Sequence, residues 1–257
     1  MENIILFIKS YRGDLQRCVA LTESIAKFNK DNIPVYLSVP TDDIELFKQN
    51  TPFYTEIISD DTITSNSKGW VGQQLVKSKV YKLDLCRFYV CLDSDVYFFK
   101  DFYIKDFLYK DDVPYMIMHE RDDFYEFVDR FPELQTYDVR AGHEAEYKSI
   151  MSHFGREGKI YHYGISPYIW DTKVWKWLDD EHNIEKLFEK HPNELKWYGE
   201  AALAMGAPMM PTSPLFKELH FGGQYQLYKQ MGWEEKHFHK QYMGMVMQSN
   251  WGAPLKY

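Results

Sequence analysis

The residues with the clearest chemical meaning are two carboxylates, Asp93 and Asp95, which follow an apolar, strand-like run at positions 86–92. Alternate side chains of an extended segment point the same way, so both carboxylates can face one cation where the strand ends. Mg²⁺ and Mn²⁺ prefer oxygen ligands, and Mg²⁺ usually reaches phosphates through one or two carboxylates. The triplet Asp93-Ser94-Asp95 therefore predicts a metal–phosphate site.

A structural turn is the alternative interpretation of the triplet. Asp-x-Asp occurs by chance in many chains, and Asp is common after strands because it tolerates turn geometry and bonds its own backbone. However, residues 96–99 are apolar again. Two carboxylates between buried segments would be energetically costly without a partner, which favours the metal site.

Composition favours one globular domain and excludes some partners. The chain has 257 residues, 45% apolar and 26% charged, and we expect a single domain over 1–257. A net charge of −8 without a Lys/Arg-dense stripe argues against a nucleic-acid partner. Aromatic residues make up 17% of the chain, which suits stacking on sugars or bases but also core packing.

Cysteine usage and the absence of long apolar segments predict a cytoplasmic protein. Cys18, Cys86 and Cys91 have no metal-type spacing and lie in apolar contexts, as expected for buried thiols in a reducing compartment. The first apolar run, 4–8, is too short for a signal peptide, and no segment approaches the ~20 residues of a transmembrane helix.

The first hundred residues alternate between strand and helix patterns. The predicted strands are 3–9, 35–39, 56–59 and 86–92, and the predicted helices are 15–29, one that begins at Thr41, and 73–83. This alternation predicts an α/β fold with a mostly parallel sheet flanked by helices, in which ligands bind beyond the carboxyl ends of the strands. The polar clusters 10–12, 60–61 and 93–95 should meet there. No dinucleotide fingerprint or P-loop is present.

The second half of the chain is less regular. We expect a strand at 113–119, helices at 172–190 and 194–205, and an irregular tail from Gly206. The polar stretch 135–160 is the best candidate for an insertion or mobile segment. A lid within 121–160 that orders when a ligand binds and excludes water is one hypothesis for this region.

The first half resembles a GT-A fold glycosyltransferase, a resemblance carried by the β-α-β pattern, segment 69–77 and the Asp93-Ser94-Asp95 triplet. It implies a nucleotide-binding half at 1–110 and an acceptor-side half at 111–257, where the resemblance is thin. In such enzymes Mn²⁺ or Mg²⁺ clamps the diphosphate of a nucleoside-diphosphate sugar, here a UDP- or GDP-sugar, as a Lewis acid. The acceptor would be a glycan or another hydroxyl compound.

The resemblance also assigns donor-binding roles. Asp95 would be the stronger metal ligand, and Asp93 would reach the metal or the ribose. The residues that would bind the nucleotide part of the donor are Ser10, Tyr11, Arg12, Asp61, Gln74, Lys77, Asp93 and Ser94. Lys79 is a substitute for Lys77, because the helix phase is not fixed. Ring faces that could pack on a sugar are those of Trp70, Tyr163, Trp170, Trp197 and Tyr198, although we expect most of them to be core. His162 is expected to line the acceptor pocket or to belong to the core.

A catalytic base and a third metal ligand follow from the same resemblance. Glu200, before an apolar run, is the candidate general base of an inverting transfer, with Glu120 and Asp122 as fallbacks. A solvated Glu stabilised by the helix dipole is the alternative for Glu200. His220 is the candidate third ligand, and His237 and His239 form a His-x-His pair that comes next.

Two other functions compete with sugar transfer. A nucleotidyltransferase shares the α/β layout and the metal carboxylates, but segment 10–14 has one glycine only, without the Gly-rich loop expected there. A non-catalytic carbohydrate-binding protein would use the aromatic residues, yet carboxylates at strand ends are unusual in such modules.

Overall fold

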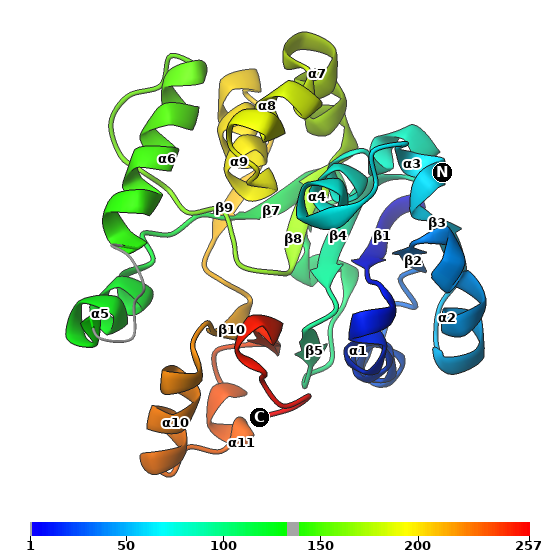
Figure 1. Cartoon of the computed structure of the whole chain (residues 1–257), viewed down its shortest axis with the longest axis vertical. Helices are drawn as coiled ribbons and strands as arrows, with labels where there is room; N and C mark the ends of the chain where they lie inside the picture. The colour runs from blue at the N-terminus through cyan, green and yellow to red at the C-terminus, as the bar shows by residue number, and fades with distance from the viewer. Residues whose placement is uncertain (1, 133–138) are drawn as a thin grey trace.

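The computed structural model describes residues 2–132 and 139–257, apart from the side chains of Asp122, Asp123 and Val139. Its centre is a five-stranded sheet in the order β3-β2-β1-β4-β8, with four parallel strands and β8 antiparallel to β4 (Figure 1). These strands are β1 (Glu2–Lys9), β2 (Val35–Val39), β3 (Glu56–Ser59), β4 (Cys86–Asp93) and β8 (Tyr168–Asp171). The predicted fold class, a mostly parallel α/β sheet, is confirmed.

The strand order changes direction beside β1. The chain runs outward from β1 to β3 and then returns to place β4 on the other side of β1. In open α/β sheets such a switch point leaves a crevice beyond the carboxyl ends of the two strands. Here those ends are followed by Ser10 and by Ser94, so the sheet topology itself brings the predicted site residues together.

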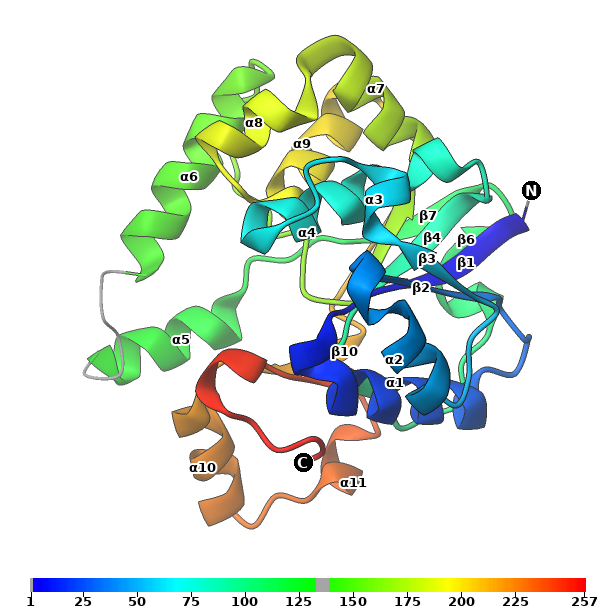
Figure 2. The same cartoon turned by 45° about the vertical axis from the view of Figure 1, so that its right-hand side comes forward.

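Helices cover both faces of the sheet (Figure 2). One face carries α1 (Leu15–Phe28) and α2 (Ile44–Asn50). The other carries α4 (Gly69–Ser78), α7 (Thr172–His182), α8 (Ile184–Lys190) and α9 (Glu194–Met205). The short α3 (Asp60–Ile63) follows β3, and α5 (Asp122–Arg130) and α6 (Val139–His153) belong to the second half of the chain.

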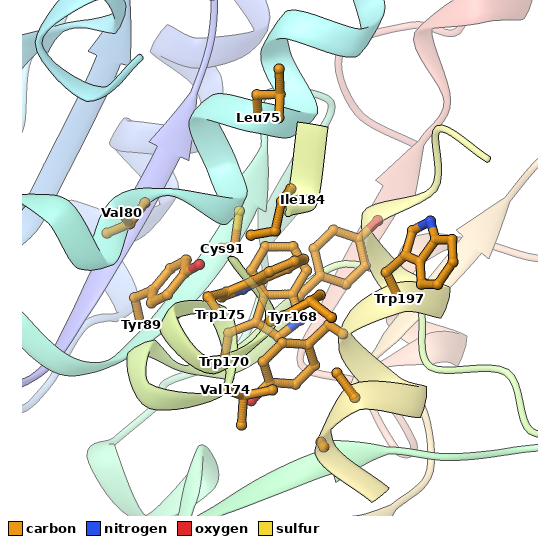
Figure 3. Packing of buried hydrophobic residues seen from close by; sticks show 14 of the residues in the cluster. Leu75, Val80, Tyr89, Cys91, Tyr168, Trp170, Val174, Trp175, Ile184 and Trp197 are labelled. Atoms are coloured by element: carbon orange, nitrogen blue, oxygen red, sulfur yellow. The ribbon is translucent and has the colours of Figure 1, made fainter. Parts of the chain in front are cut away.

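The alternation of side chains along the strands produces two cores. Ile5 and Phe7 of β1 face the aromatic cluster under α7–α9, where Trp170 and Trp175 pack edge to face with ring centroids 5.1 Å apart (Figure 3). Leu6 and neighbouring alternate residues face α1 and α2 instead. Both faces are thus apolar, which is why the strands read as continuous hydrophobic runs.

Two small sheets complete the chain. The first has the order β10-β11-β5, and β5 (Val96–Phe98) begins directly after the Asp93-Ser94-Asp95 triplet. Its partners are β10 (Phe216–Leu219) and β11 (Gly244–Met247). The second, β6-β7-β9, comprises β6 (Leu108–Lys110), β7 (Val113–Ile117) and β9 (Met210–Thr212). Helices α10 (Gly222–Gln230) and α11 (Glu235–Phe238) lie between β10 and β11 in sequence.

Some predicted boundaries were wrong. The helix predicted at 172–190 is broken at Asn183, which has φ +58° and accepts a hydrogen bond from Lys186 N–H as the cap of α8. Much of the stretch 135–160, predicted as an insertion or mobile, forms α6, which packs on α9. Residues 133–138 lie outside the description. The tail predicted as irregular folds into β9–β11 and α10–α11.

Two expectations about the whole chain can be compared with the structure. Cys18, Cys86 and Cys91 are buried free thiols, as predicted. No helix among the described residues has the length and apolar character needed to cross a membrane.

Close packing between α9 and the segment before β8 predicts that one Gly-to-Ala substitution destabilises the fold, although this change in a helix interior is usually stabilising. Ala usually stabilises a helix interior by about 1 kcal/mol over Gly. A Cβ on Gly199, however, would lie 2.1–2.4 Å from ring atoms of Tyr163. We expect Gly199→Ala to lower the free energy of unfolding by about 1–3 kcal/mol in urea titrations.

Gly222→Ala is the matched control, since its Cβ would meet the Trp251 ring at 3.4 Å, an ordinary contact. Equal stability of Gly199→Ala and the wild type would contradict the packing described here.

Candidate functional site

A cavity of about 580 Å³ opens beyond the carboxyl ends of β1 and β4. Its size is within the range of small-molecule sites. The predicted site residues that line it are Ser10, Tyr11, Lys77, Asp93, Ser94, Asp95 and His220. The start of α9 and the C-terminal segment 246–250 complete its walls, so both halves of the chain build one site.

A buried lysine organises the floor of the cavity. The Nζ of Lys77 lies 2.5 Å from Oδ1 of Asp93 and 3.1 Å from Oε1 of Glu194. Burial alone would lower the pKa of Lys77, but the two carboxylates outweigh it and hold the pKa well above its ordinary value. Tyr168 also donates a hydrogen bond to Asp93 (3.4 Å). Asp93 is therefore fixed, with its charge already compensated by protein groups.

Asp95 has a different environment. Its Oδ2 accepts a hydrogen bond from the backbone N–H of Ser249 (2.9 Å), and no Lys or Arg of the described chain forms an ion pair with it. Burial, and next the charge of Asp93, raises the pKa of Asp95 to about 6. A half-buried carboxylate that no described Lys or Arg pairs with fits a hard divalent cation, which would favour its charged form.

The small sheet β10-β11-β5 brings His220 to the same side of the cavity as Asp95. Leu219 pairs with Met247 and Val246 pairs with Val96, so β11 lies between the residues that follow β10 and those that precede β5. His220 Nδ1 lies 3.1 Å from Oε1 of Glu218. Within the described ranges no preformed group of three or more His, Cys, Asp or Glu side chains could hold a metal ion. The donor types fit a cation, but the ligand set is not preassembled.

An ion pair at the end of β1 borders the cavity. Lys9, which sequence analysis missed, lines the cavity and lies 2.9 Å from Oδ2 of Asp60, whose Oδ1 accepts a hydrogen bond from Ser38 (2.6 Å). Burial lowers the pKa of Lys9 in spite of Asp60. A lysine in an otherwise apolar strand was the signal that could have found it. Tyr11 and Trp70, 51% and 62% exposed, stand at the cavity rim.

Several predicted donor-binding residues do not line the cavity. Arg12 is directed to Asp43, with Nε 2.6 Å from Oδ1. Asp61 accepts hydrogen bonds from Thr41 and Ser67 on the exposed side of α3. These contacts fix loops around the site instead of facing a ligand.

The remaining alternatives also point elsewhere. Gln74 is buried, and its Oε1 accepts a hydrogen bond from the backbone N–H of Glu194 (3.2 Å). Lys79, the substitute for Lys77, pairs with Glu185 outside the cavity. His237 and His239 lie on and after α11 and do not line the cavity, and His239 stacks on Phe99, which follows β5. The side chain of Asp122 is outside the described part. Glu120, exposed, pairs with Lys159 (2.5 Å).

Glu200 is not placed to act as a base in this cavity. It lies in the middle of α9, its side chain is 0% exposed, and it does not line the cavity. Its Oε2 accepts a hydrogen bond from Arg156 Nε (2.5 Å), and its Oε1 accepts one from Tyr163 (2.6 Å). The sequence pointed to Glu200 as an acidic residue of an apolar helix. The acidic residue of α9 that lines the cavity is instead Glu194, the first residue of the helix.

Part of the cavity is lined by side chains that sequence analysis did not predict, namely Arg121, His143, Tyr147 and Lys196. His162, which was expected to line a pocket or the core, is buried and also lines the cavity. Burial, reinforced by nearby cationic side chains, lowers the pKa of His162 to about 2 and that of His143 to about 4. Both imidazoles are therefore neutral at physiological pH and can donate and accept hydrogen bonds.

With this geometry in place, comparisons identify the chain's relatives. Residues 3–248 match the profile of a family described as "Family of unknown function (DUF6492)". The chain belongs to the DUF6492 family. No curated protein sequence matches this DUF6492 protein.

The fold of the DUF6492 protein has a solved counterpart. The apo crystal structure of mouse xyloside xylosyltransferase 1 is similar to it, with a TM-score of 0.53 and 8% sequence identity, over 99% of this chain and 100% of that chain. At this identity the likeness shows the fold alone. The DUF6492 protein thus has a GT-A-like glycosyltransferase fold.

The neutral state of His162 predicts a pH effect on stability. The unfolded chain binds a proton near the ordinary pKa of 6.5, whereas the folded chain does not. The stability linked to this group is complete above that pH and is lost as pH falls towards the folded pKa. From pH 6.5 to 5.0 we expect a loss on the order of 1.5 kcal/mol, and a smaller loss in His162→Gln.

Urea unfolding at the two pH values measures this effect. His237→Gln, at an exposed position, is the control and should keep the wild-type slope. An identical slope in His162→Gln would show that the pKa of His162 does not change on folding of the DUF6492 protein.

The ion pair of Glu200 with Arg156 predicts a structural role. Glu200→Gln leaves the guanidinium without its anionic partner, and we expect a loss on the order of 3 kcal/mol in the free energy of unfolding. Glu189→Gln, on the exposed face of α8, should change it by less than about 0.5 kcal/mol. Unchanged stability in Glu200→Gln would mean that the carboxylate is not held as described.

Proposed function

We propose that this DUF6492 protein is a metal-dependent glycosyltransferase that moves a sugar from a nucleoside-diphosphate sugar to a hydroxyl of a glycan or another acceptor. The observation that carries this proposal is Asp95, a half-buried carboxylate without an ion-pair partner among the described Lys and Arg side chains, at the switch point of a GT-A-like fold. Asp93 lies beside it with Lys77 as its counterion. A diphosphate bridged by a divalent cation would satisfy this charge arrangement.

The lining residues suggest an order of subsites along the cavity. The exposed rings of Tyr11 and Trp70 offer stacking surfaces for a nucleobase at the rim. The Asp93–Asp95 edge would hold the diphosphate. The end lined by His143 and His162, whose neutral rings can bond hydroxyls, would receive the sugar and the acceptor.

The metal would be Mn²⁺ or Mg²⁺, held by Asp95 and His220 with Asp93 nearby. When bound, it supplies Lewis-acid stabilisation of the leaving diphosphate. Lys77 orients Asp93 at the edge of the sheet, and the Ser249 N–H orients Asp95. Because Glu200 lies outside the cavity, we assign it no part in the chemistry and propose sugar transfer without an inverting base.

Ligand-dependent stability tests the proposal. We expect UDP or GDP, or a sugar ester of one of them, to raise Tm only together with Mn²⁺, by about 5–10 °C at 100 times the dissociation constant. Asp95→Asn should abolish this shift. Its own Tm without ligand should not fall, because a desolvated carboxylate is removed. Sugar transfer to an acceptor, or hydrolysis of the sugar ester, is then measured with the nucleotide identified.

Asp84→Asn is the matched control, since Asp84 lies on an exposed turn at φ +51°, a conformation that Asn also adopts. It should retain the full shift. No shift with any nucleotide, with or without Mn²⁺, would overturn the proposal, and a shift with sugars alone would favour a carbohydrate-binding protein.

A further inference from the structure

We propose that Glu218 is a positioning residue of the metal site, which holds the His220 ring with Nδ1–H towards its carboxylate and leaves Nε2 for the cation. This inference rests on the metal dependence of the proposed function. It adds to that function a residue that sequence analysis did not single out.

The contacts of Glu218 form a closed arrangement. Its Oε1 lies 3.1 Å from His220 Nδ1 and accepts a hydrogen bond from Gln248 Nε2 (3.0 Å). Its Oε2 accepts one from Arg121 (2.7 Å). The side chain is 11% exposed and lines the cavity. Both carboxylate oxygens are thus fixed by residues that follow β10, precede α5 and follow β11.

This arrangement determines the tautomer of His220. A neutral imidazole carries one N–H, and an ionised carboxylate can only accept. Nδ1 must therefore be the protonated nitrogen, and the lone pair is on Nε2, where no described protein group forms a hydrogen bond. Histidines that bind metals commonly donate their other ring N–H to a carboxylate in this way.

The surroundings of the pair restrict the ring further. The Phe124 ring packs edge to face against His220, with centroids 5.0 Å apart, and Arg121 lies over the same Phe124 ring at 4.0 Å. Arg121 adopts φ +63°, a conformation that is uncommon for residues other than glycine, at the start of α5. The backbone there is held in a strained state that directs the guanidinium to Glu218.

The pairing of β10, β11 and β5 explains why His220, and not another histidine, is aligned with Asp95. Gln248 follows β11 and His220 follows β10, at adjacent positions of the paired strands. Met247 N–H donates to the carbonyl of Asp95 (2.8 Å), which places the first carboxylate ligand on the next strand. Asp95, Gln248 and His220 thus belong to neighbouring strand ends, and Glu218 orients the last of them.

A variant at Glu218 tests the hydrogen bond directly. In Glu218→Gln the amide oxygen should remain with Arg121, so the amide nitrogen faces Nδ1 and donates to it. Two readouts are used, long-range ¹H–¹⁵N NMR of the histidine rings without metal, and Mn²⁺ titration by electron paramagnetic resonance, alone and with UDP or GDP. We expect the Nδ1–H tautomer in the wild type, the Nε2–H tautomer in Glu218→Gln, and Mn²⁺ affinity reduced roughly tenfold or more.

Controls separate this role from a loss of folding. His220→Ala should weaken Mn²⁺ binding at least as much as Glu218→Gln. Glu235→Gln alters another Glu–His pair, with His239 at 3.4 Å, away from the cavity, and should leave Mn²⁺ affinity within twofold. If Glu218→Gln does not fold, Glu218→Asp keeps the charge for Arg121 but retracts from His220, with the same expected loss.

The outcomes are distinct. If the wild type binds no Mn²⁺ with either nucleotide, the metal dependence of the proposed function fails and this inference fails with it. If His220→Ala weakens Mn²⁺ binding but Glu218→Gln does not, or if the tautomer is unchanged in Glu218→Gln, only the role of Glu218 is overturned. A wild-type affinity in His220→Ala would overturn the assignment of His220 as a ligand, and Glu218 with it.

Discussion

The buried ammonium of Lys77 is the interaction on which the arrangement of the site depends. It joins α4 to Asp93 at the end of β4 and to Glu194 at the start of α9. A cation in such surroundings is stable only with carboxylate partners, so the pairing fixes three elements relative to one another. Lys9 at the end of β1 and Asp60 after β3 form a second buried ion pair of the same kind. Asp95, in contrast, forms no ion pair with a described Lys or Arg side chain and accepts a hydrogen bond from the backbone N–H of Ser249.

Local patterns predicted the framework of the fold well. Apolar runs of strand length, each followed by an amphipathic helix, indicate parallel β-α-β units because burial on both sheet faces demands that pattern. The carboxylates of Asp93 and Asp95 were found because they interrupt such a run. Their position at the switch point follows from topology, which the alternation of elements implies.

Long-range pairing could not be predicted. Lys77 and Glu194 are 117 positions apart, and the sequence around either residue does not indicate that the two form an ion pair. Glu194 and Glu200 are both acidic residues of α9, and only the packing of the helix decides that one faces the cavity and the other faces Arg156. Likewise, His220 lies near Asp95 because β11, from the end of the chain, is inserted between their strands.

The support of Asp95 by the C-terminal segment has a consequence for biosynthesis. The N–H groups that hold its carbonyl and carboxylate belong to Met247 and Ser249. During translation the N-terminal sheet emerges first and can begin to fold as a unit. Asp95 nevertheless lacks these donors until the segment that contains Met247 and Ser249 has been synthesised, more than 150 residues later. The surroundings of Asp95 are thus completed only when β11 pairs with β5, long after β4 has been made.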